Sequence, residues 1–420
     1  MDDQYLVSKF QIHRSDPLFN QLDKMTFDSK NLYNTCLYRE RQAFFARRAD
    51  PTSPGVIDKY KLISALQNEN QVDYRPLPAA VAQQVCIQVY DGFKGFFAEI
   101  KNNQQASIPH YKHKTKGRNK LVFTLGAISK SHLRNGYIKL TGIDYKFKVP
   151  SHIHFNTIKQ VIITPAHNEV INVIICYQVP QVQLKPDNNR YMGIDLGVSN
   201  VMTCATNTKD VKPFIIDGKK IKSVNQHYNK QMANLQSKND KHNSNIKRTH
   251  KMCSVTKNRN NKLEDFAHKI SKFICEVALS KCINTIIIGK NDNWKQQVNL
   301  GNKNNQNFVQ IPYNKFIDKI KYKCALKGIN VVLTEESYTS KCSFFDNEGM
   351  THHDVYQGKR IRRGLFKLSN GKTINADVNG ALNIIRKVHP MIVNDLGIAD
   401  VAHPIRISTS CVNTKFAMSL

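Results

Sequence analysis

The stretch MGIDLGVSNVMTCATN, residues 192–207, decides the fold of the second half of the chain. It begins as an apolar strand, passes through a turn that contains glycine and continues as a second apolar strand, which predicts a pair of buried strands. Asp195 stands inside the first of them. A carboxylate in a buried strand is costly unless it is paired or binds a cation, so Asp195 is a candidate site residue.

Strands and helices alternate in the chain after this stretch. Short apolar runs that end at Gly289 and Thr334 predict two further strands, TIIIG and NVVLT. Segments with helical periodicity lie between and after them, at 266–282, 316–329 and 375–388. The alternation predicts an α/β layer from about residue 190 to residue 390.

The chain before residue 190 has a different organisation. YLVSKFQIH, residues 5–13, alternates like a strand, and helical spacing then dominates to about residue 104, with a break at Asp50-Pro51. Strand patterns joined by turns follow, and LKPDNNR, residues 184–190, is typical of a linker. A helical block followed by a strand block predicts either two small modules or one split barrel with a helical insert.

The composition is strongly basic. Lys and Arg total 62 against 32 Asp and Glu, a formal net charge of +30. Such an excess repels itself unless a polyanion neutralises it, which indicates nucleic acid as the partner. No apolar run reaches the ~18 residues of a spanning helix, so no membrane partner is expected. The ten cysteines are scattered without a CxxC pair, which is typical of a reducing compartment such as the cytoplasm.

A polar zone over residues 219–262 is rich in Lys and Asn and poor in apolar positions. A solvated pair of helices would have this composition, and so would a surface that contacts phosphates. The sequence leaves both interpretations open.

Carboxylates at several places suit a metal-dependent hydrolase. Phosphodiester hydrolysis by two divalent ions about 4 Å apart needs acids from different elements, and Mg²⁺ prefers such oxygen ligands. Asp195 and Asp377 supply two, although Asp377 also suits a helix N-terminus. Glu335 and Glu336 follow a strand. Since side chains alternate along a strand, only one of the two could enter a shared site. The alternative interpretation is that both lie at a solvated strand end. Asp292, in a turn-like Asn-Asp-Asn segment, is a further candidate.

Five motifs follow one another in order along this half of the chain. They are GIDLGVSN from residue 193, IIIGKNDNWKQ from 286, TEESYTSKCSFFD from 334, GKRIRRGLF from 358 and NADVNGALNIIRKV from 375. Together they resemble the TnpB (OrfB) proteins of bacterial and archaeal insertion sequences, which are related to the type V CRISPR effectors. The resemblance is dense from about 190 to 390 and looser upstream.

The resemblance implies an RNA-guided DNA endonuclease in a prokaryotic cytoplasm, held at the nucleoid by nucleic acid. It would use a transposon-derived guide RNA, one or two copies per RNA, to recognise double-stranded target DNA next to a short adjacent motif. The implied architecture is a wedge-like β-barrel over 1–15 and 105–187, a helical recognition insert over 16–104, an RNase H-like RuvC nuclease domain over 190–339 and 375–395, a degenerate zinc-ribbon-like insertion over 340–374 and a C-terminal tail over 396–420.

The resemblance also assigns the site. By motif, two RuvC acids are Asp195 and Asp377, and most relatives place a glutamate at the position of Gly289. Its absence implies either an inactive nuclease or a relocated glutamate. Glu336, three residues before Thr339, fits the relocated place, with Glu335 as the second choice. Asp195, Glu336 and Asp377 are then expected to be catalytic and to hold two Mg²⁺ ions.

A second departure concerns zinc and the nucleic-acid surface. Relatives commonly carry a four-cysteine ribbon after the TS dipeptide, whereas Cys342 has no CxxC partner. Cys342, Asp346, His352 and His353 are an alternative ligand set, but a zinc-free insertion that contacts nucleic acid is expected. The candidate nucleic-acid residues are Tyr111, Lys112, Lys114, Lys116, Arg118, Lys290, Lys341, Arg360, Arg362 and Arg363, and the loop with Trp294 and Lys295 is interpreted as structural or facing nucleic acid.

Three other classes of protein compete with this interpretation. GIDLG also resembles the phosphate loop of actin-like ATPases and sugar kinases, but the chain lacks their later Gly-rich loop, and that class would not explain the charge. A nuclease-inactive RNA-guided DNA-binding repressor is the main alternative, which the presence of Asp195 and Asp377 disfavours. A transposase that acts by a carboxylate triad on transposon ends has no acid pattern of its own here.

Overall fold

The computed structural model describes residues 4–52, 55–102, 105–197, 199–241, 247–291, 311–392, 395–408 and 417. The chain divides into two compact units, residues 1–181 and 182–420, and each is described by itself. Among the described helices, none is long and apolar enough to cross a membrane.

The first unit contains an antiparallel sheet whose order is β1-β6-β5-β2. Its strands are β1 (Gln4–His13), β2 (Leu121–Thr124), β5 (Ile158–Ile163) and β6 (Val170–Val179), and a separate pair joins β3 (Tyr137–Lys139) to β4 (Lys146–Lys148). β1 and β6 pair along their whole length, which ties the first strand of the chain to the last strand of the unit. β1 and β2 lie at the edges of the described sheet, so closure into a barrel stays a prediction.

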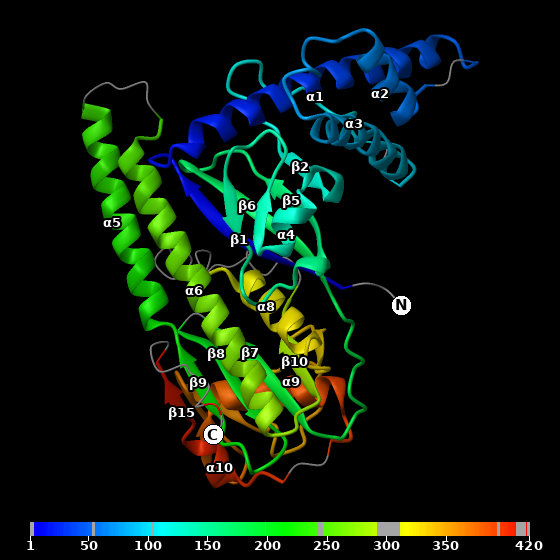
Figure 1. Ribbon diagram of the computed structural model, residues 1–420. Helices are drawn as coiled ribbons and strands as arrows, with labels where there is room; N and C mark the ends of the chain where they lie inside the picture. The colour runs from blue at the N-terminus through cyan, green and yellow to red at the C-terminus, as the bar shows by residue number, and fades with distance from the viewer. Residues whose placement is uncertain are drawn as a thin grey trace. The chain divides into compact units, whose positions relative to one another are not determined.

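In the order of the chain, helices make up most of the segment between β1 and β2 of this unit (Figure 1). They are α1 (Leu18–Ala49), α2 (Lys59–Asn68) and α3 (Ala79–Ile100), with the short α4 (Lys130–Arg134) after β2. α1 ends before Asp50-Pro51, as predicted, because a proline disfavours helical backbone at the residue that precedes it. The apolar stripe of α3 is buried from Val81 to Phe96, whereas Ile100 at the helix end is 39 % exposed.

The second unit is built on a six-stranded mixed sheet of order β11-β10-β7-β8-β9-β15. The strands are β7 (Tyr191–Leu196), β8 (Asn200–Thr206), β9 (Phe214–Asp217), β10 (Thr285–Gly289), β11 (Asn330–Thr334) and β15 (Ile405–Ile407). β7, β10 and β11 are parallel, and β8 is antiparallel to β7 and β9. β15 comes from the predicted tail over 396–420, which therefore supplies an edge strand beside β9.

Helices cover both faces of this sheet (Figure 1). α6 (His250–Ser280) and α8 (Tyr313–Ala325) pack on one face, and α9 (Ala376–Val388) packs on the other; α5 (Lys219–Lys241) runs beside α6, and α10 (Ile398–Ala402) is short. The polar zone over 219–262 thus lies on a pair of helices.

The alternation of side chains along β7 decides what each face receives. Met192, Ile194 and Leu196 belong to the core that contains α6 and α8. Gly193 and Asp195 therefore point to the face covered by α9. β10 follows the same rule, because Ile286 and Ile288 join the first core and Ile287 the second, which turns Gly289 towards α9 as well.

Gly193 lets α9 approach the sheet closely. A Cβ atom at this position would lie 2.1 Å from the backbone oxygen of Ala381 and 2.8 Å from the side chain of Ile385. Both contacts are on α9, so only glycine permits the observed helix-to-strand distance. Gly380 has the same role from the helix side, since its Cβ would lie 3.2 Å from Oδ2 of Asp195.

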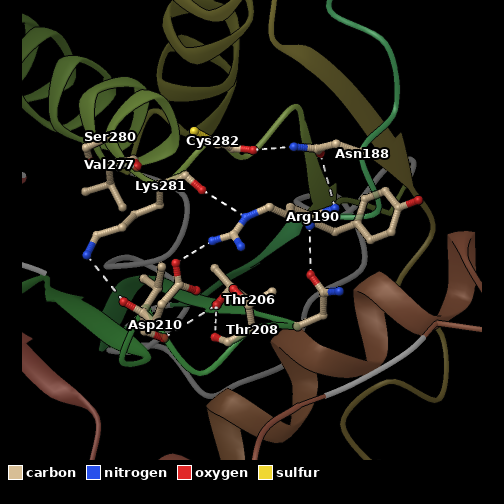
Figure 2. A network of polar contacts seen from close by, with 12 residues as sticks. Asn188, Arg190, Thr206, Thr208, Asp210, Val277, Ser280, Lys281 and Cys282 are labelled. Carbon is tan, nitrogen blue, oxygen red and sulfur yellow. Dashed lines mark hydrogen bonds and ion pairs between the residues drawn. The ribbon is translucent and has the colours of Figure 1, made fainter.

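A polar network fixes how the linker joins β7 (Figure 2). Nε of Arg190 donates to the backbone oxygen of Lys281 at 3.0 Å, and its guanidinium also pairs with Asp210. Asn188 donates to the backbone oxygen of Cys282 at 2.7 Å. The end of α6 and the β8–β9 connection are thereby joined at the point where β7 begins.

The insertion after β11 is held by polar side chains of α9. It contains the sheet β12 (Lys359–Arg362), β13 (Leu365–Lys367) and β14 (Thr373–Asn375). Asn379 and Asn383, both fully buried, donate to the backbone oxygen of Cys342 at 2.8 and 2.7 Å, and Arg386 donates to that of Glu348 at 2.6 Å. These hydrogen bonds hold the insertion against α9.

Gly193→Ala is expected to lower the free energy of unfolding by about 1–3 kcal/mol, because a backbone oxygen must move to admit the methyl group. Urea unfolding followed by circular dichroism measures the loss. Gly126→Ala is the matched control, since no atom lies within 4 Å of the Cβ that it adds. An equal effect of the two substitutions would contradict the close contact between α9 and β7.

Candidate active site

Asp195 is the centre of the candidate site. Removal from solvent is the main cause that raises its pKa well above the usual range, and the charges of Glu336 and Asp377 raise it further. In the described part of the chain, no lysine or arginine forms an ion pair with Asp195 or Glu336; Arg360 opposes the shift only by its charge. Asp195 therefore lies within electrostatic reach of both Glu336 and Asp377, with little compensating positive charge.

Glu336 occupies the space beside Gly289. A Cβ atom on Gly289 would lie 3.1 Å from Oε2 of Glu336, and also 2.6 Å from Ile384 of α9. The carboxylate of Glu336 thus stands where a side chain at position 289 would begin. Burial, followed by the charge of Glu335, raises the pKa of Glu336 to about 7.

Local hydrogen bonds turn the two glutamates in different directions. The backbone nitrogen of Glu336 donates to Asn291 at 2.8 Å, and Thr339 Oγ1 donates to its backbone oxygen at 2.8 Å. Glu335, whose side chain is 60 % exposed, forms an ion pair with Lys387 at 3.0 Å. Glu335, the second choice for the ligand, is therefore directed away from Asp195.

Asp377 lies in the first turn of α9 but does not cap it. The cap is Asn375, which accepts from the backbone nitrogens of Asp377 and Val378 at 3.0 and 3.2 Å. Both carboxylate oxygens of Asp377 have other partners: Asn200 donates to Oδ2 at 2.6 Å and Arg360 to Oδ1 at 3.1 Å. Asn375, and not Asp377, therefore caps the helix.

Basic side chains gather at Ser199, the neighbour of Asn200. Arg363 and Lys222 both donate to the hydroxyl of Ser199, Lys222 at 3.1 Å. Burial and the charge of Arg363 lower the pKa of Lys222. Of the predicted nucleic-acid residues, Arg360 therefore contacts the acid Asp377 and Arg363 contacts Ser199, whereas Asn200 and Lys222 carried no signal in the sequence.

Tyr313 is another residue that sequence reasoning missed. It is 1 % exposed, and its hydroxyl donates to the backbone oxygen of Gly197 at 2.7 Å. Burial raises its pKa, and the charges of Asp195 and Glu336 raise it further. A phenol that stays protonated beside two acids can orient the turn that follows β7.

The remaining predicted nucleic-acid residues have separate surroundings. In the first unit, Arg118 pairs with Asp23 at 2.8 Å, and the rings of Tyr111 and Tyr33 lie under the cations of Arg41 and Lys112. In the second unit, the Lys341 cation lies over the ring of Tyr356. The backbone oxygen of Lys114 accepts a hydrogen bond from the side chain of Lys30. The other predicted nucleic-acid residues in the described part of the chain are Lys116, Lys290 and Arg362. Asp292, Trp294 and Lys295 lie outside the described residues.

The donor set suits a hard cation in its chemistry. Carboxylate oxygens are the ligands that Mg²⁺ prefers, and a shared cation would relieve the repulsion that raises the pKa of Asp195. In the described part of the chain, however, no three His, Cys, Asp or Glu side chains form a ready-made ligand group, and this holds for the set around Cys342 too. Asp377 in particular is engaged by Asn200 and Arg360.

Two family models match the chain. Residues 174–295 match the OrfB model of IS605-type elements, described as a probable transposase, and residues 313–384 match the Cas12f1-like TNB domain. The matched ranges contain Asp195 and Gly289 in the first model, and Glu336 and Asp377 in the second.

Curated proteins match at low identity. A TnpB-like protein, ORF457 of Acidianus two-tailed virus, is 24 % identical over 221 residues, which is 50 % of this chain and 45 % of that protein. The CRISPR-associated endodeoxyribonuclease Cas12f1 of Syntrophomonas palmitatica is 23 % identical over 348 residues, 73 % of this chain and 68 % of that protein. The match therefore spans less than half of the viral relative.

A solved structure shares the fold. The chain in the cryo-EM structure of a Cas12f1–sgRNA–target DNA complex is 16 % identical, with a TM-score of 0.53 over 87 % of this chain and 82 % of that chain. The mixed α/β content is thus common to both. The family models, the relatives and the shared fold agree in their likeness to TnpB-like and Cas12f1 proteins.

Proposed function

We propose that this protein is an RNA-guided DNA endonuclease that hydrolyses phosphodiester bonds at Asp195, Glu336 and Asp377. The observation that carries the proposal is the position of the Glu336 carboxylate, which fills the space beside Gly289 and raises the pKa of Asp195. Partly buried acids that repel one another are unfavourable for the fold alone, and such perturbed groups gather at functional sites.

The proposed cofactor is a pair of Mg²⁺ ions held by the oxygens of Asp195, Glu336 and Asp377. Bound there, divalent ions would activate water and stabilise the leaving oxygen. Asp377 would exchange its contact with Arg360 for the cation, since both carboxylate oxygens are already engaged. Arg360, Arg363 and Lys222 would then face the phosphates of the DNA strand.

The proposed partners are a transposon-derived guide RNA and double-stranded target DNA next to a short motif. The solved Cas12f1 relative is a complex with an sgRNA and target DNA, and the charge of +30 on this chain suits two polyanions. We further propose that the second unit is an RNase H-like RuvC domain, which its sheet order supports, and that the first unit is the wedge-like barrel with its recognition insert. The cytoplasm is the proposed location.

A nuclease-inactive RNA-guided repressor is the second candidate. Gly289, where relatives place a glutamate, favours it. The position of Glu336 argues against it, because an abandoned site would not need to keep an uncompensated carboxylate beside Asp195.

Asp195→Ala is expected to lower target cleavage by more than about 100-fold, because it removes the central ligand. The assay uses the protein with its co-purified RNA, a plasmid that carries a sequence complementary to the variable end of that RNA, and Mg²⁺. Guided binding in a filter assay should persist, since it depends on basic residues elsewhere. Cleavage by Asp195→Ala at the normal rate would remove Asp195 from the site.

Glu336→Gln and Glu335→Gln form a matched pair that tests the relocated glutamate. Glu336→Gln should abolish cleavage, whereas Glu335→Gln should change the rate by less than about fivefold, because it removes only an exposed ion pair with Lys387. The opposite order would move the site by one residue. Full activity in both variants would end the relocation hypothesis.

The metal-free protein should become less stable as the pH rises through Glu336's titration. Its pKa is about 7 in the fold against 4.5 in an unfolded chain, so between these values the folded state binds more protons and the free energy of unfolding falls with pH. At pH 8 in EDTA, Glu336→Gln should therefore be more stable than the parent by on the order of 1–3 kcal/mol. At pH 4 the two should melt together.

Thermal melts at both pH values measure this difference, and Mg²⁺ should raise the melting temperature of the parent but not of Glu336→Gln. Glu335→Gln is the control with the opposite sign, because the hydrogen bonds of Glu335 with Ser337 and Lys387 lower its pKa. A Glu336→Gln variant that is less stable than the parent at pH 8 would show that the carboxylate serves the fold.

A further inference from the structure

Helices α5 and α6 line a cavity of about 220 Å³ that opens to solvent, since most of the side chains that line it are exposed. Both helices belong to the second unit and run side by side in Figure 1. Side chains of both contribute to the wall, and most of them are polar or charged. The lining residues are Val224, His227, Tyr228, Gln231, Lys251, Ser254, Val255, Asn258, Arg259 and Lys262.

The charge of this cavity is of one sign. Lys251, Arg259 and Lys262 line it, His227 adds a group that can be protonated, and none of the described lining residues is acidic. Three cations around one small space repel one another unless an anion or water lies between them. The cavity therefore favours an anionic ligand.

One side of the cavity carries a tyrosine ring with an arginine guanidinium next to it, and this pair is called the platform below. The guanidinium of Arg259 lies 5.4 Å from the centre of the Tyr228 ring. Nε of Arg259 donates to Asn225 at 2.9 Å and Nη1 to Asn260 at 3.1 Å, so its plane is held in place. Planar cations and tyrosine rings are the surfaces on which unpaired bases stack.

The volume of the cavity and its polar side chains restrict the kind of ligand further. A dry cavity of roughly 150 Å³ admits a benzene ring, so this one is wide enough for one base. Ser254, Asn258 and Gln231 offer hydrogen-bond donors and acceptors beside the cations, which an apolar ring would leave unsatisfied. A ligand with a flat ring and a phosphate could contact both the Tyr228–Arg259 platform and the lysines.

We propose that this cavity binds one unpaired nucleotide of a single-stranded nucleic-acid segment, with its base on the Tyr228–Arg259 platform and its phosphate at Lys251 and Lys262. The site depends on the proposed function only in taking nucleic acid as the partner. It lies on α5 and α6, whereas the proposed acids lie on β7, on α9 and after β11, so binding here is separable from cleavage.

The test uses the full-length protein and two fluorescein-labelled probes, a 12-nucleotide oligouridylate and oligothymidylate of the same length. Lys251→Gln/Lys262→Gln should weaken anisotropy-measured binding by about tenfold and lower its salt dependence, because two phosphate contacts are lost. Lys230→Gln/Lys238→Gln is the matched control: it removes the same charge from exposed α5 positions outside the cavity, and should change affinity by less than about twofold. An equal loss in both double variants would show binding by general charge and overturn the proposal.

Tyr228→Ala tests the platform, with an expected loss of about five- to tenfold at unchanged salt dependence. Photo-crosslinking with 4-thiouridine in the RNA probe should label residues 227–231 or 251–262 in the parent. Labelling only elsewhere would contradict the site even if Tyr228→Ala fails to fold. A stronger effect on the RNA probe than on the DNA probe would assign the nucleotide to RNA. If Lys251→Gln/Lys262→Gln binds the probes more weakly but the RNA-loaded variant still cleaves its target, this site is supported independently of the proposed nuclease function.

Discussion

The burial of Asp195 close to two other carboxylates, at the centre of the mixed sheet, is the constraint on which the candidate site depends. Asp195 is inside β7, and the charges of Glu336 and Asp377 raise its pKa beyond what removal from solvent causes. Placing these groups together destabilises the fold unless a cation joins them. The sheet, the helix α9 and the turn after β11 all contribute to holding this unfavourable arrangement.

Glycines make that arrangement possible. Gly193 admits α9 to the surface of β7, Gly380 leaves room for the Asp195 carboxylate, and Gly289 leaves room for Glu336. Side-chain alternation in β7 and β10 places all the groups concerned on the face that α9 covers. A residue larger than glycine at position 289 would meet both Glu336 and Ile384.

Much of this could be predicted from the sequence, because apolar periodicity reports burial directly. The strands at β7, β10 and β11, the helix α9 and the break at Asp50-Pro51 followed from such patterns. Contacts between distant segments could not be predicted in this way. The pairing of Arg360 and Asn200 with Asp377, the edge strand β15 and the cavity between α5 and α6 depend on how the chain folds back, which no local pattern records.

The most direct measurement is an anomalous-scattering map from crystals of the protein soaked in Mn²⁺ in place of Mg²⁺. We expect a manganese peak within coordination distance of the carboxylates of Asp195 and Glu336, with Arg360 withdrawn from Asp377 and Glu335 still paired with Lys387. A peak bound by Glu335 instead, or a map with no peak between β7 and the turn after β11 at saturating Mn²⁺, would contradict it.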